Sequence, residues 1–198
     1  MFITFEGVDG SGKSTQVRLV SELLREEGRE VLTTREPGGT AFGEKIRDLI
    51  LGGEGLAPWA EAALFAAARA QLVDEVVRPA QARGQDILCD RYIDSSLAYQ
   101  GLARGLGVER VLELNLAATG HLLPDRTFLI LVPLEQAKLR RGDEPDRIER
   151  EGEDFVARVD SAYRELAVIF AERIVTVDGS QPPQALAELI RGHLRDLP

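Results

Sequence analysis

The sequence has a single cysteine, no long apolar run and a deficit of basic side chains. Cys89 has no partner for an intrachain disulfide, and it ends the apolar run that begins at Ile87, so a buried thiol in a reducing cytoplasm is expected. The 33 acidic and 24 basic residues give a formal net charge of −9, which argues against a nucleic-acid-binding surface. No apolar run approaches the ~18 residues of a membrane span, and the amino terminus carries no signal-peptide pattern. We therefore expect neither a membrane partner nor export.

A glycine-rich motif near the amino terminus predicts a phosphate-binding loop. Residues Gly7 to Ser14 read GVDGSGKS and have the form G-x-x-x-x-G-K-[ST]. An apolar run from Phe2 to Phe5 precedes the motif, and Thr15 to Glu27 follows it with apolar residues at helical spacing. The glycines let backbone amides approach phosphate oxygens, and the positive end of the helix dipole faces the same anion. The motif predicts nucleoside triphosphate binding, with Lys13 on the β- and γ-phosphates and the Ser14 hydroxyl on Mg²⁺.

Strand-like and helix-like segments alternate along the chain, whose 198 residues suit one domain over 1–198. Because such alternation favours a mostly parallel sheet covered on both faces, we expect an α/β fold with five parallel strands. The apolar stretch Ala60 to Ala82 is expected either to pack within the core or to meet another copy of the chain. The predicted strands are Phe2 to Phe5, Glu30 to Thr34, Asp86 to Cys89, Thr127 to Val132 and Ile174 to Val177. Helices are predicted after the glycine-rich motif and over 43–51, 59–82, 108–118, 134–140, 154–172 and 183–195.

Four polar clusters follow the predicted strands or the helix after one of them. Because ligands of parallel sheets gather beyond the carboxyl ends of the strands, we expect the clusters to line one cleft. Their arginines suit phosphate or a planar base edge, and Asp90 stands where P-loop proteins place a carboxylate near Mg²⁺. The last cluster mixes arginines with acids, Gly142 and Pro145, as is typical of a mobile lid. The clusters are GVDGSGKST, REPGGT (Arg35 to Thr40), DRYIDSSLAYQG (Asp90 to Gly101) and RRGDEPDRIERE (Arg140 to Glu151).

Several classes of nucleotide-binding protein fit a phosphate-binding loop. A GTP-hydrolysing switch generally carries N-K-x-D, but the only asparagine, Asn115, is followed by Leu-Ala-Ala, which disfavours that class. A kinase that phosphorylates another phosphate needs movable cations, because donor and acceptor are both anions, and the cluster at 140–151 supplies arginines. An unspecific ATPase, another nucleotide or nucleoside kinase acting on dUMP or a deoxynucleoside, and a regulatory protein that has lost catalysis stay open.

The order and spacing of these motifs resemble the thymidylate kinase family over nearly the whole chain. The resemblance rests on FEGVDGSGKST, TREPGGT, LFAAAR (Leu64 to Arg69), DRYIDSSLAYQG and DRIE (Asp146 to Glu149). It implies transfer of the γ-phosphate of ATP to dTMP with Mg²⁺, on a P-loop nucleoside monophosphate kinase fold that dimerises through helices and has a lid at about 140–152. The reaction, which forms dTDP, would be a step of dTTP biosynthesis.

The family divides by whether a catalytic arginine lies in the phosphate-binding loop or in the lid. Positions 8–11 read VDGS and contain no arginine, so the chain resembles the bacterial type with lid arginines. Because a phosphate monoester is already largely dianionic at pH 7, no general base is needed and Asp90 is not expected to accept a proton. Arg147 is the first candidate in the lid, ahead of Arg140, Arg141 and Arg150, and the expected catalytic set is Lys13, Arg91, Arg147 and Asp9.

The resemblance also assigns residues to each substrate. Phe65 would stack on thymine, and Arg69 would hydrogen-bond its O4. Gln100 and Ser96 would reach the remaining polar edge of the base. Some members of the family have Asn at the position of Ser96. Tyr99 would crowd the sugar 2′ position. Arg35 and Arg91 would hold the dTMP phosphate, Asp9 would lie near the 3′-hydroxyl, and Asp9 and Asp90 would hold waters on a Mg²⁺ bound to Ser14. The expected ATP-binding set is Gly7, Val8, Asp9, Gly10, Ser11, Gly12, Lys13, Ser14, Thr15 and Arg140, with the loop Asp178 to Gln181 against the adenine.

Overall fold

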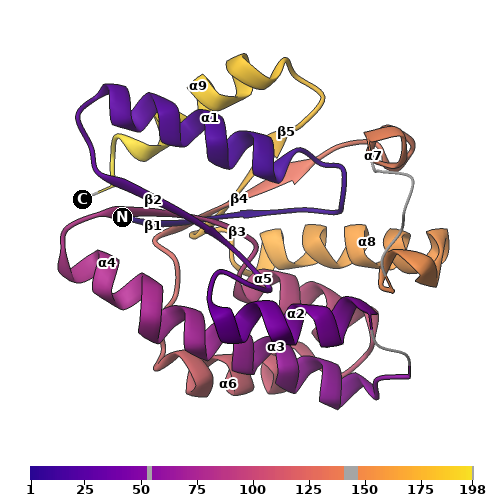
Figure 1. Ribbon diagram of the computed structural model, residues 1–198. Helices are drawn as coiled ribbons and strands as arrows, with labels where there is room; N and C mark the ends of the chain where they lie inside the picture. Colours follow the sequence, from indigo (N-terminus) through magenta and orange to yellow (C-terminus); the bar gives the residue numbers. More distant parts are fainter. Residues whose placement is uncertain (53–54, 141–146, 198) are drawn as a thin grey trace.

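A single five-stranded sheet organises the chain (Figure 1). The computed structural model describes residues 1–52, 55–140 and 147–197. All neighbouring strands are parallel, in the order β2-β3-β1-β4-β5, so the fold class is confirmed. Each predicted strand is present and shifted by at most one residue at either end: β1 (Phe2–Glu6), β2 (Val31–Arg35), β3 (Asp86–Asp90), β4 (Arg126–Leu131) and β5 (Ile174–Asp178).

Helices cover both faces of the sheet, as predicted. In Figure 1, α1 (Lys13–Glu26) and α9 (Pro183–Leu194) lie above it and pack against each other. The lower layer holds the remaining helices except α7 (Leu134–Arg140), which follows β4 at the edge of the view. That layer contains α2 (Ala41–Gly52), α3 (Pro58–Leu72), α4 (Arg78–Ala82), α5 (Ile93–Ser96), α6 (Val108–Thr119) and α8 (Glu153–Ile169).

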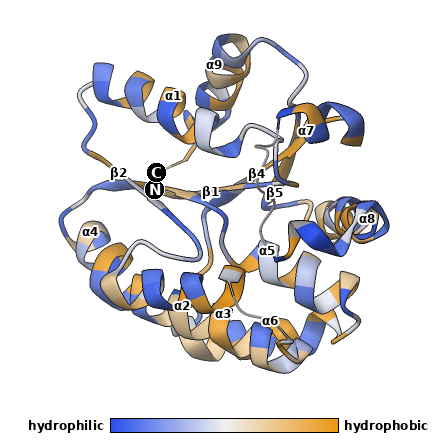
Figure 2. Cartoon of the chain, turned by 45° about the vertical axis from the view of Figure 1, so that its right-hand side comes forward, coloured by the Kyte–Doolittle hydropathy of each residue, from blue (hydrophilic) through white to orange (hydrophobic). Residues whose placement is uncertain are grey.

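Alternation along the strands divides the core into two clusters. Successive side chains of a strand point to opposite faces. Ile3 and Phe5 of β1 therefore pack with α1 and α9, whereas Phe2 packs with the helices of the other layer. Hydrophobic and hydrophilic residues alternate along the covering helices (Figure 2), as expected when one side of a helix meets a sheet and the other meets solvent.

The apolar stretch predicted as one helix over 59–82 is nearly continuous. It comprises α3, a π-helical segment (Val73–Val77) and α4. Because α3 packs against both α2 and α6, part of its apolar surface, including Phe65 and Leu72, is buried within the chain, which supports the first of the two expectations for this stretch. Contact with another copy stays a prediction.

One helical region was not predicted from the sequence. The segment IDSSLAYQGLA forms α5 and a π-helical continuation, Leu97–Ala103. Its buried side chains include Asp94, Ser95, Ser96 and Gln100. The buried face of a helix is normally apolar and is predicted from the spacing of apolar residues, but here that face carries polar residues. Asp94 accepts hydrogen bonds from Thr127 and Arg173, and the hydrogen bonds of Ser95, Ser96 and Gln100 are described below.

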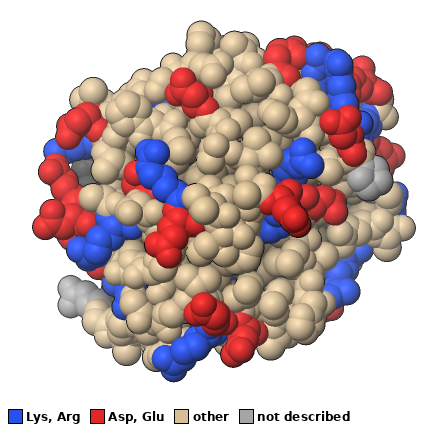
Figure 3. Space-filling view, turned by 180° about the vertical axis from the view of Figure 1, so that it is seen from behind, with Lys and Arg blue, Asp and Glu red and all other residues tan. Residues whose placement is uncertain are grey.

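Charged side chains of both signs share the surface. On the face shown in Figure 3, Lys and Arg lie beside Asp and Glu. Within the described ranges, no helix has both the length and the apolar character needed to cross a membrane. The expectation that the chain has no nucleic-acid partner stays a prediction.

Neighbouring residues of α9 offer a test of the upper core layer. Ile190 is fully buried between α9 and the sheet, whereas Leu189 is 43% exposed. We expect Ile190→Ala to lower the free energy of unfolding by ~2–5 kcal/mol because it leaves a cavity, and Leu189→Ala to lower it by less than ~1 kcal/mol. Urea denaturation of the ligand-free protein measures both values; equal losses would contradict this packing.

Candidate active site

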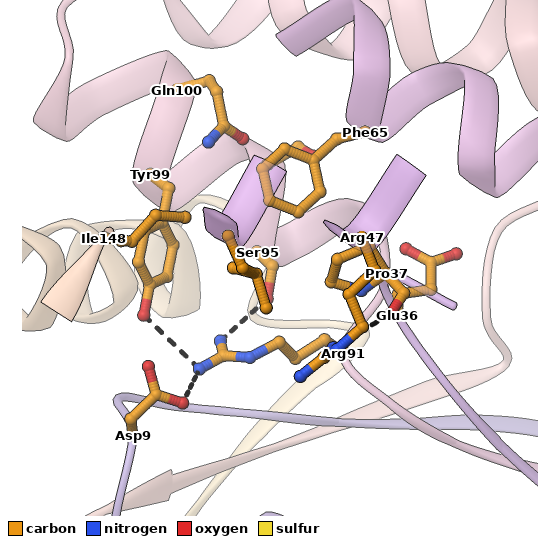
Figure 4. A pocket seen from close by; sticks show the side chains of 12 residues that line it. Asp9, Glu36, Pro37, Arg47, Phe65, Arg91, Ser95, Tyr99, Gln100 and Ile148 are labelled. Carbon is orange, nitrogen blue, oxygen red and sulfur yellow. Dashed lines mark hydrogen bonds and ion pairs between the residues drawn. The ribbon is translucent and has the colours of Figure 1, made fainter. Parts of the chain in front are cut away.

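Two adjoining pockets lie at the carboxyl ends of the strands. Residues from all four polar clusters line one of them, the outer pocket, so the prediction of a shared cleft is confirmed. The outer pocket is lined by Asp9, Gly10, Gly12, Lys13, Ser14, Thr15, Arg35, Glu36, Arg47, Asp90, Arg91 and Arg140. The inner pocket is lined by Asp9, Glu36, Pro37, Arg47, Leu51, Phe65, Arg91, Ser95, Ser96, Tyr99, Gln100 and Ile148 (Figure 4).

The loop between β1 and α1 has the geometry of a phosphate cradle. Gly7 and Gly10 have φ values of +137° and +82°, and a Cβ there would lie 2.5 Å from Ile130 O and 2.1 Å from Ala137 O. Only glycine fits such a close approach. Lys13 is 5% exposed and donates to the Val8 carbonyl at 3.0 Å. Burial lowers the pKa of Lys13, and Arg91 lowers it further, against the opposing effect of Asp9 and Asp90.

Oxygen ligands suited to Mg²⁺ lie at one end of this loop. Ser14 Oγ donates a 2.5 Å hydrogen bond to Asp90 Oδ2 at the end of β3, so a hydroxyl and a carboxylate meet beside the cradle. Among the described residues, no group of three or more His, Cys, Asp or Glu is placed to hold a metal ion. The Ser14 hydroxyl and the Asp90 carboxylate fit Mg²⁺, which binds through one or two carboxylates together with waters and substrate phosphates.

Arg91 connects the two pockets. Its guanidinium donates to Asp9 Oδ1 at 2.6 Å, to Ser95 Oγ at 3.1 Å and to Tyr99 OH at 3.4 Å (Figure 4). It also donates to Tyr163 OH at 3.1 Å. The residue adopts a left-handed backbone conformation, with φ of +71°. Such a conformation is unfavourable for a long side chain and persists where the surroundings impose it. The contacts hold a positive charge at the boundary between the cradle and the inner pocket.

A buried carboxylate beneath the site holds these partners of Arg91. Glu6 Oε1 accepts hydrogen bonds from the backbone of Tyr92 and Ser95, and Oε2 accepts from the hydroxyls of Ser95 and Tyr163. Burial raises the pKa of Glu6, with Asp94 adding to the rise while Arg91 and the hydrogen bonds oppose it. Glu6 thus fixes the start of α5 and the two hydroxyls that orient Arg91.

The inner pocket has walls like those of a small-molecule site, which combine aromatic or apolar side chains with a few polar groups. Phe65 and Tyr99 contribute aromatic faces, and Ser96 and Gln100 contribute polar groups. A flat ring with a polar edge fits this combination.

Arg69 lies behind the wall of the inner pocket, at 1% exposure. Its guanidinium donates to Glu36 at 2.7 Å, Ser96 Oγ at 3.0 Å, Tyr92 O at 2.9 Å and Asn115 Oδ1. Burial raises the pKa of Glu36 to about 7, although Arg69 lowers it. The second carboxylate oxygen, Glu36 Oε1, is buried without a hydrogen-bond partner in the part of the chain that the structure describes. The donors of Arg69 face these protein groups. Its contact with a base stays a prediction.

Two other predicted arginines lie in the outer pocket. Arg35 is exposed and donates to Glu44 at 3.1 Å, away from the inner pocket. Arg140 donates to Gly179 O at 3.1 Å, which brings it to the loop after β5, as its predicted place beside an adenine requires. Arg141 lies outside the described residues, as do 142–146 of the predicted lid, and Arg150 is exposed.

Arg147 points away from the phosphate-binding loop. Its side chain donates to Glu61 Oε2 and, at 2.7 Å, to Ile50 O, and its backbone N–H donates to Leu51 O at 3.2 Å. These contacts place the residue beside α2 and α3. A role at the transferring phosphoryl group stays a prediction.

The structure adds site residues that the sequence analysis did not select. Arg47 of α2 lines both pockets and donates to Pro37 O at 3.0 Å. Glu36 belongs to the REPGGT cluster, so the sequence could have indicated it as a site residue. Arg47 and Glu61 lie on helices among other charged residues. Ile148 lines the inner pocket; it belongs to the DRIE motif, but the sequence analysis gave it no role. No local pattern marks Arg47 or Glu61.

Comparisons with known proteins agree on one family. The family model for thymidylate kinase matches residues 5–190. The chain is 47% identical to the thymidylate kinase of Caldanaerobacter subterraneus subsp. tengcongensis over 191 residues, covering 96% of this chain and 92% of that one. It is 45% identical to the thymidylate kinase of Bifidobacterium longum over 202 residues, covering 100% and 98%. The crystal structure of thymidylate kinase from Ehrlichia chaffeensis superposes with a TM-score of 0.82 at 31% identity and 98% coverage of both chains. The chain therefore belongs to the thymidylate kinase family.

Proposed function

We propose that this chain transfers the γ-phosphoryl group of ATP to dTMP, giving dTDP and ADP on the route to dTTP. The observation that carries the proposal is the overlap of the two pockets at Asp9, Glu36, Arg47 and Arg91. A triphosphate in the cradle and a nucleotide in the inner pocket would direct their phosphates toward the same arginines. Membership in the thymidylate kinase family supports the choice of substrates.

The outer pocket would bind ATP. The amides of the loop from Gly7 to Thr15 and the Lys13 ammonium would hold its phosphates, and Arg140 with the loop after β5 would contact the adenine. Ser14 and, through water, Asp90 and Asp9 would hold Mg²⁺. The ion would neutralise charge on the phosphates when bound.

The inner pocket would bind dTMP. Phe65 and Tyr99 provide faces for the thymine and the sugar, and Ser96 and Gln100 provide hydrogen-bonding groups for the base. Arg91, with Arg35 and Arg47 nearby, would hold the phosphate. Arg69 would read O4 only if it exchanged one of its present partners for the base.

Charge neutralisation and alignment would drive the reaction. Both reacting groups are anionic, and the acceptor needs no general base, because its phosphate is largely dianionic at neutral pH. Lys13, Arg91 and the metal would bring the anions together, with Asp9 orienting Arg91. Arg147, which donates to Glu61 in the structure, would join them only after both nucleotides are bound.

We also infer a single cytoplasmic domain, with a lid at about 140–152, that forms a homodimer through helices. Exposed apolar side chains on α2 and α3 support the dimer: Phe42 and Leu49 are 45% and 57% exposed, and Trp59 is 38% exposed. Apolar residues on one helical layer are typical of an interface between subunits.

The reaction itself is tested by ADP formation with ATP and Mg²⁺ and one acceptor at a time. We expect dTMP to be clearly preferred over dUMP, dCMP, dGMP and dAMP, and thymidine to be inert because it lacks the phosphate that Arg91 would hold. A methyl group is worth only ~1–3 kcal/mol, so some activity with dUMP is expected. Equal ADP formation without any acceptor would refute the proposal.

Replacing Arg91 tests the shared boundary of the pockets. A lysine cannot reproduce the contacts of a planar guanidinium with Asp9, Ser95 and Tyr163. We expect Arg91→Lys to lower kcat/KM for dTMP by ~100-fold or more, the order of loss for an oriented donor at a reacting group. Steady-state kinetics measure the loss against Arg83→Lys, an exposed arginine that bonds Gln85. A loss below about threefold would remove Arg91 from the mechanism.

The role of Asp90 is tested by the pH dependence of turnover. If Asp90 holds metal-bound water and accepts no proton, Asp90→Asn should raise the Mg²⁺ concentration for half-maximal rate by ~10-fold or more. The pH profile of kcat at saturating Mg²⁺ should keep the shape of the parent's, because that shape reflects substrate phosphates with a second pKa of about 6. A limb of the profile that disappears in Asp90→Asn would show that Asp90 acts as a base.

A further inference from the structure

A buried carboxylate at the start of α3 accepts hydrogen bonds from two other parts of the chain. Glu61 is 1% exposed. Its Oε1 accepts from Gln100 Nε2 at 2.8 Å and from Arg104 Nε at 2.6 Å, and its Oε2 accepts from Arg104 Nη2 at 3.0 Å and from Arg147 Nη2. Gln100 belongs to the helical segment after α5, Arg104 directly follows that segment, and Arg147 belongs to the segment before α8.

The charge of Glu61 determines how Gln100 is oriented. Burial raises the pKa of Glu61, but hydrogen bonds from Arg104, Arg147 and Gln100 outweigh it, so that pKa lies below its usual value and the group is ionised. An ionised carboxylate only accepts hydrogen bonds, so the Gln100 amide must turn its NH₂ toward Glu61. Its oxygen is then on the side of the Phe65 ring in the inner pocket (Figure 4).

The amide oxygen has a defined preference among bases. No hydrogen bond within the described ranges uses Gln100 Oε1. An oxygen fixed at the pocket accepts a hydrogen bond from the N3–H of thymine or uracil, whereas the N3 of cytosine is itself an acceptor and would repel it. If the amide were free to turn, this distinction would weaken.

The same carboxylate holds the segment that closes the inner pocket. Besides the bond from Arg147 to Glu61, Arg104 Nη1 donates to Glu151 Oε2 at 3.0 Å, and the Arg104 guanidinium lies 4.8 Å from the centre of the Phe155 ring. Between these contacts, Ile148 is 8% exposed and lines the inner pocket. Residues 147–151 are thus tied to Glu61 directly and through Arg104.

We propose that Glu61 is a positioning residue that couples closure of the 147–151 segment to reading of the acceptor base. It holds the Gln100 amide oxygen toward the inner pocket, and it holds Arg147 and Arg104 so that Ile148 covers the same pocket. Its effect on the base rests on the proposed function, whereas its hold on the 147–151 segment does not.

Glu61→Gln keeps the shape of the side chain and removes its charge. With the amide no longer fixed and the arginines released, we expect KM for dTMP to rise ~10-fold, the order of one lost hydrogen bond, while KM for ATP stays within twofold. In the ligand-free protein, amide hydrogen exchange over 147–151, followed by mass spectrometry, should be ~10-fold faster than in the parent. Glu22→Gln, which breaks an exposed pair with Arg18, should change none of these values.

A second variant separates the two effects of Glu61. Gln100→Leu removes the amide but keeps both arginines on the carboxylate, so KM for dTMP should rise while exchange over 147–151 stays at the parental rate. Unchanged exchange in Glu61→Gln, or faster exchange with an unchanged KM for dTMP, would overturn the proposal. A general loss of structure would instead speed exchange throughout the chain and raise both KM values, and that result would also count against a positioning role. If the parent protein does not phosphorylate dTMP, the proposed function fails, and the exchange measurement alone decides whether Glu61 holds the segment.

Discussion

The ion pair between Arg91 and Asp9 is the interaction on which the arrangement of both pockets depends. Arg91 follows β3 and Asp9 belongs to the loop after β1, so their 2.6 Å contact joins adjacent strand ends across the mouth of the site. A half-buried charge of this kind is stable only with full pairing, because removing either partner leaves the other desolvated. Glu6 completes the pairing from below, through the Ser95 and Tyr163 hydroxyls that accept from Arg91.

The site concentrates positive charge in a chain whose net charge is −9. Lysine and arginine side chains line the outer pocket, and nearby acidic residues form ion pairs with individual arginines. Glu44 holds Arg35, Asp9 holds Arg91, and Glu61 holds Arg147. Glu44 and Asp9 therefore orient the guanidinium groups of Arg35 and Arg91, and under the proposed function this lowers the entropy cost of gathering cations around two phosphates.

The sequence was informative where local patterns carry the signal and uninformative where distant groups meet. The phosphate-binding loop was predicted because its glycines, its lysine and its flanking strand and helix lie within a short stretch whose backbone has few alternatives. The helix that begins at Ile93 was not predicted, because its buried face is polar. Glu6 of β1 accepts hydrogen bonds from Ser95 on that face. The contact of Arg69 with a base stays a prediction; its donors face Glu36, Ser96, Asn115 and Tyr92, partners from three separate segments that no local pattern brings together.

By itself, the sequence determined the five strands, the covering helices and the order of the motifs, because hydrophobic periodicity and glycine geometry act between near neighbours. Only the tertiary structure decided which of the many arginines reach the pockets. Arg47 and Arg91 line both pockets, whereas Arg69 lies behind the wall and Arg147 lies on Glu61. The direction of a long charged side chain is set by the buried carboxylate or carbonyl that it meets, and those partners are brought close only when strands and helices distant in the sequence pack together.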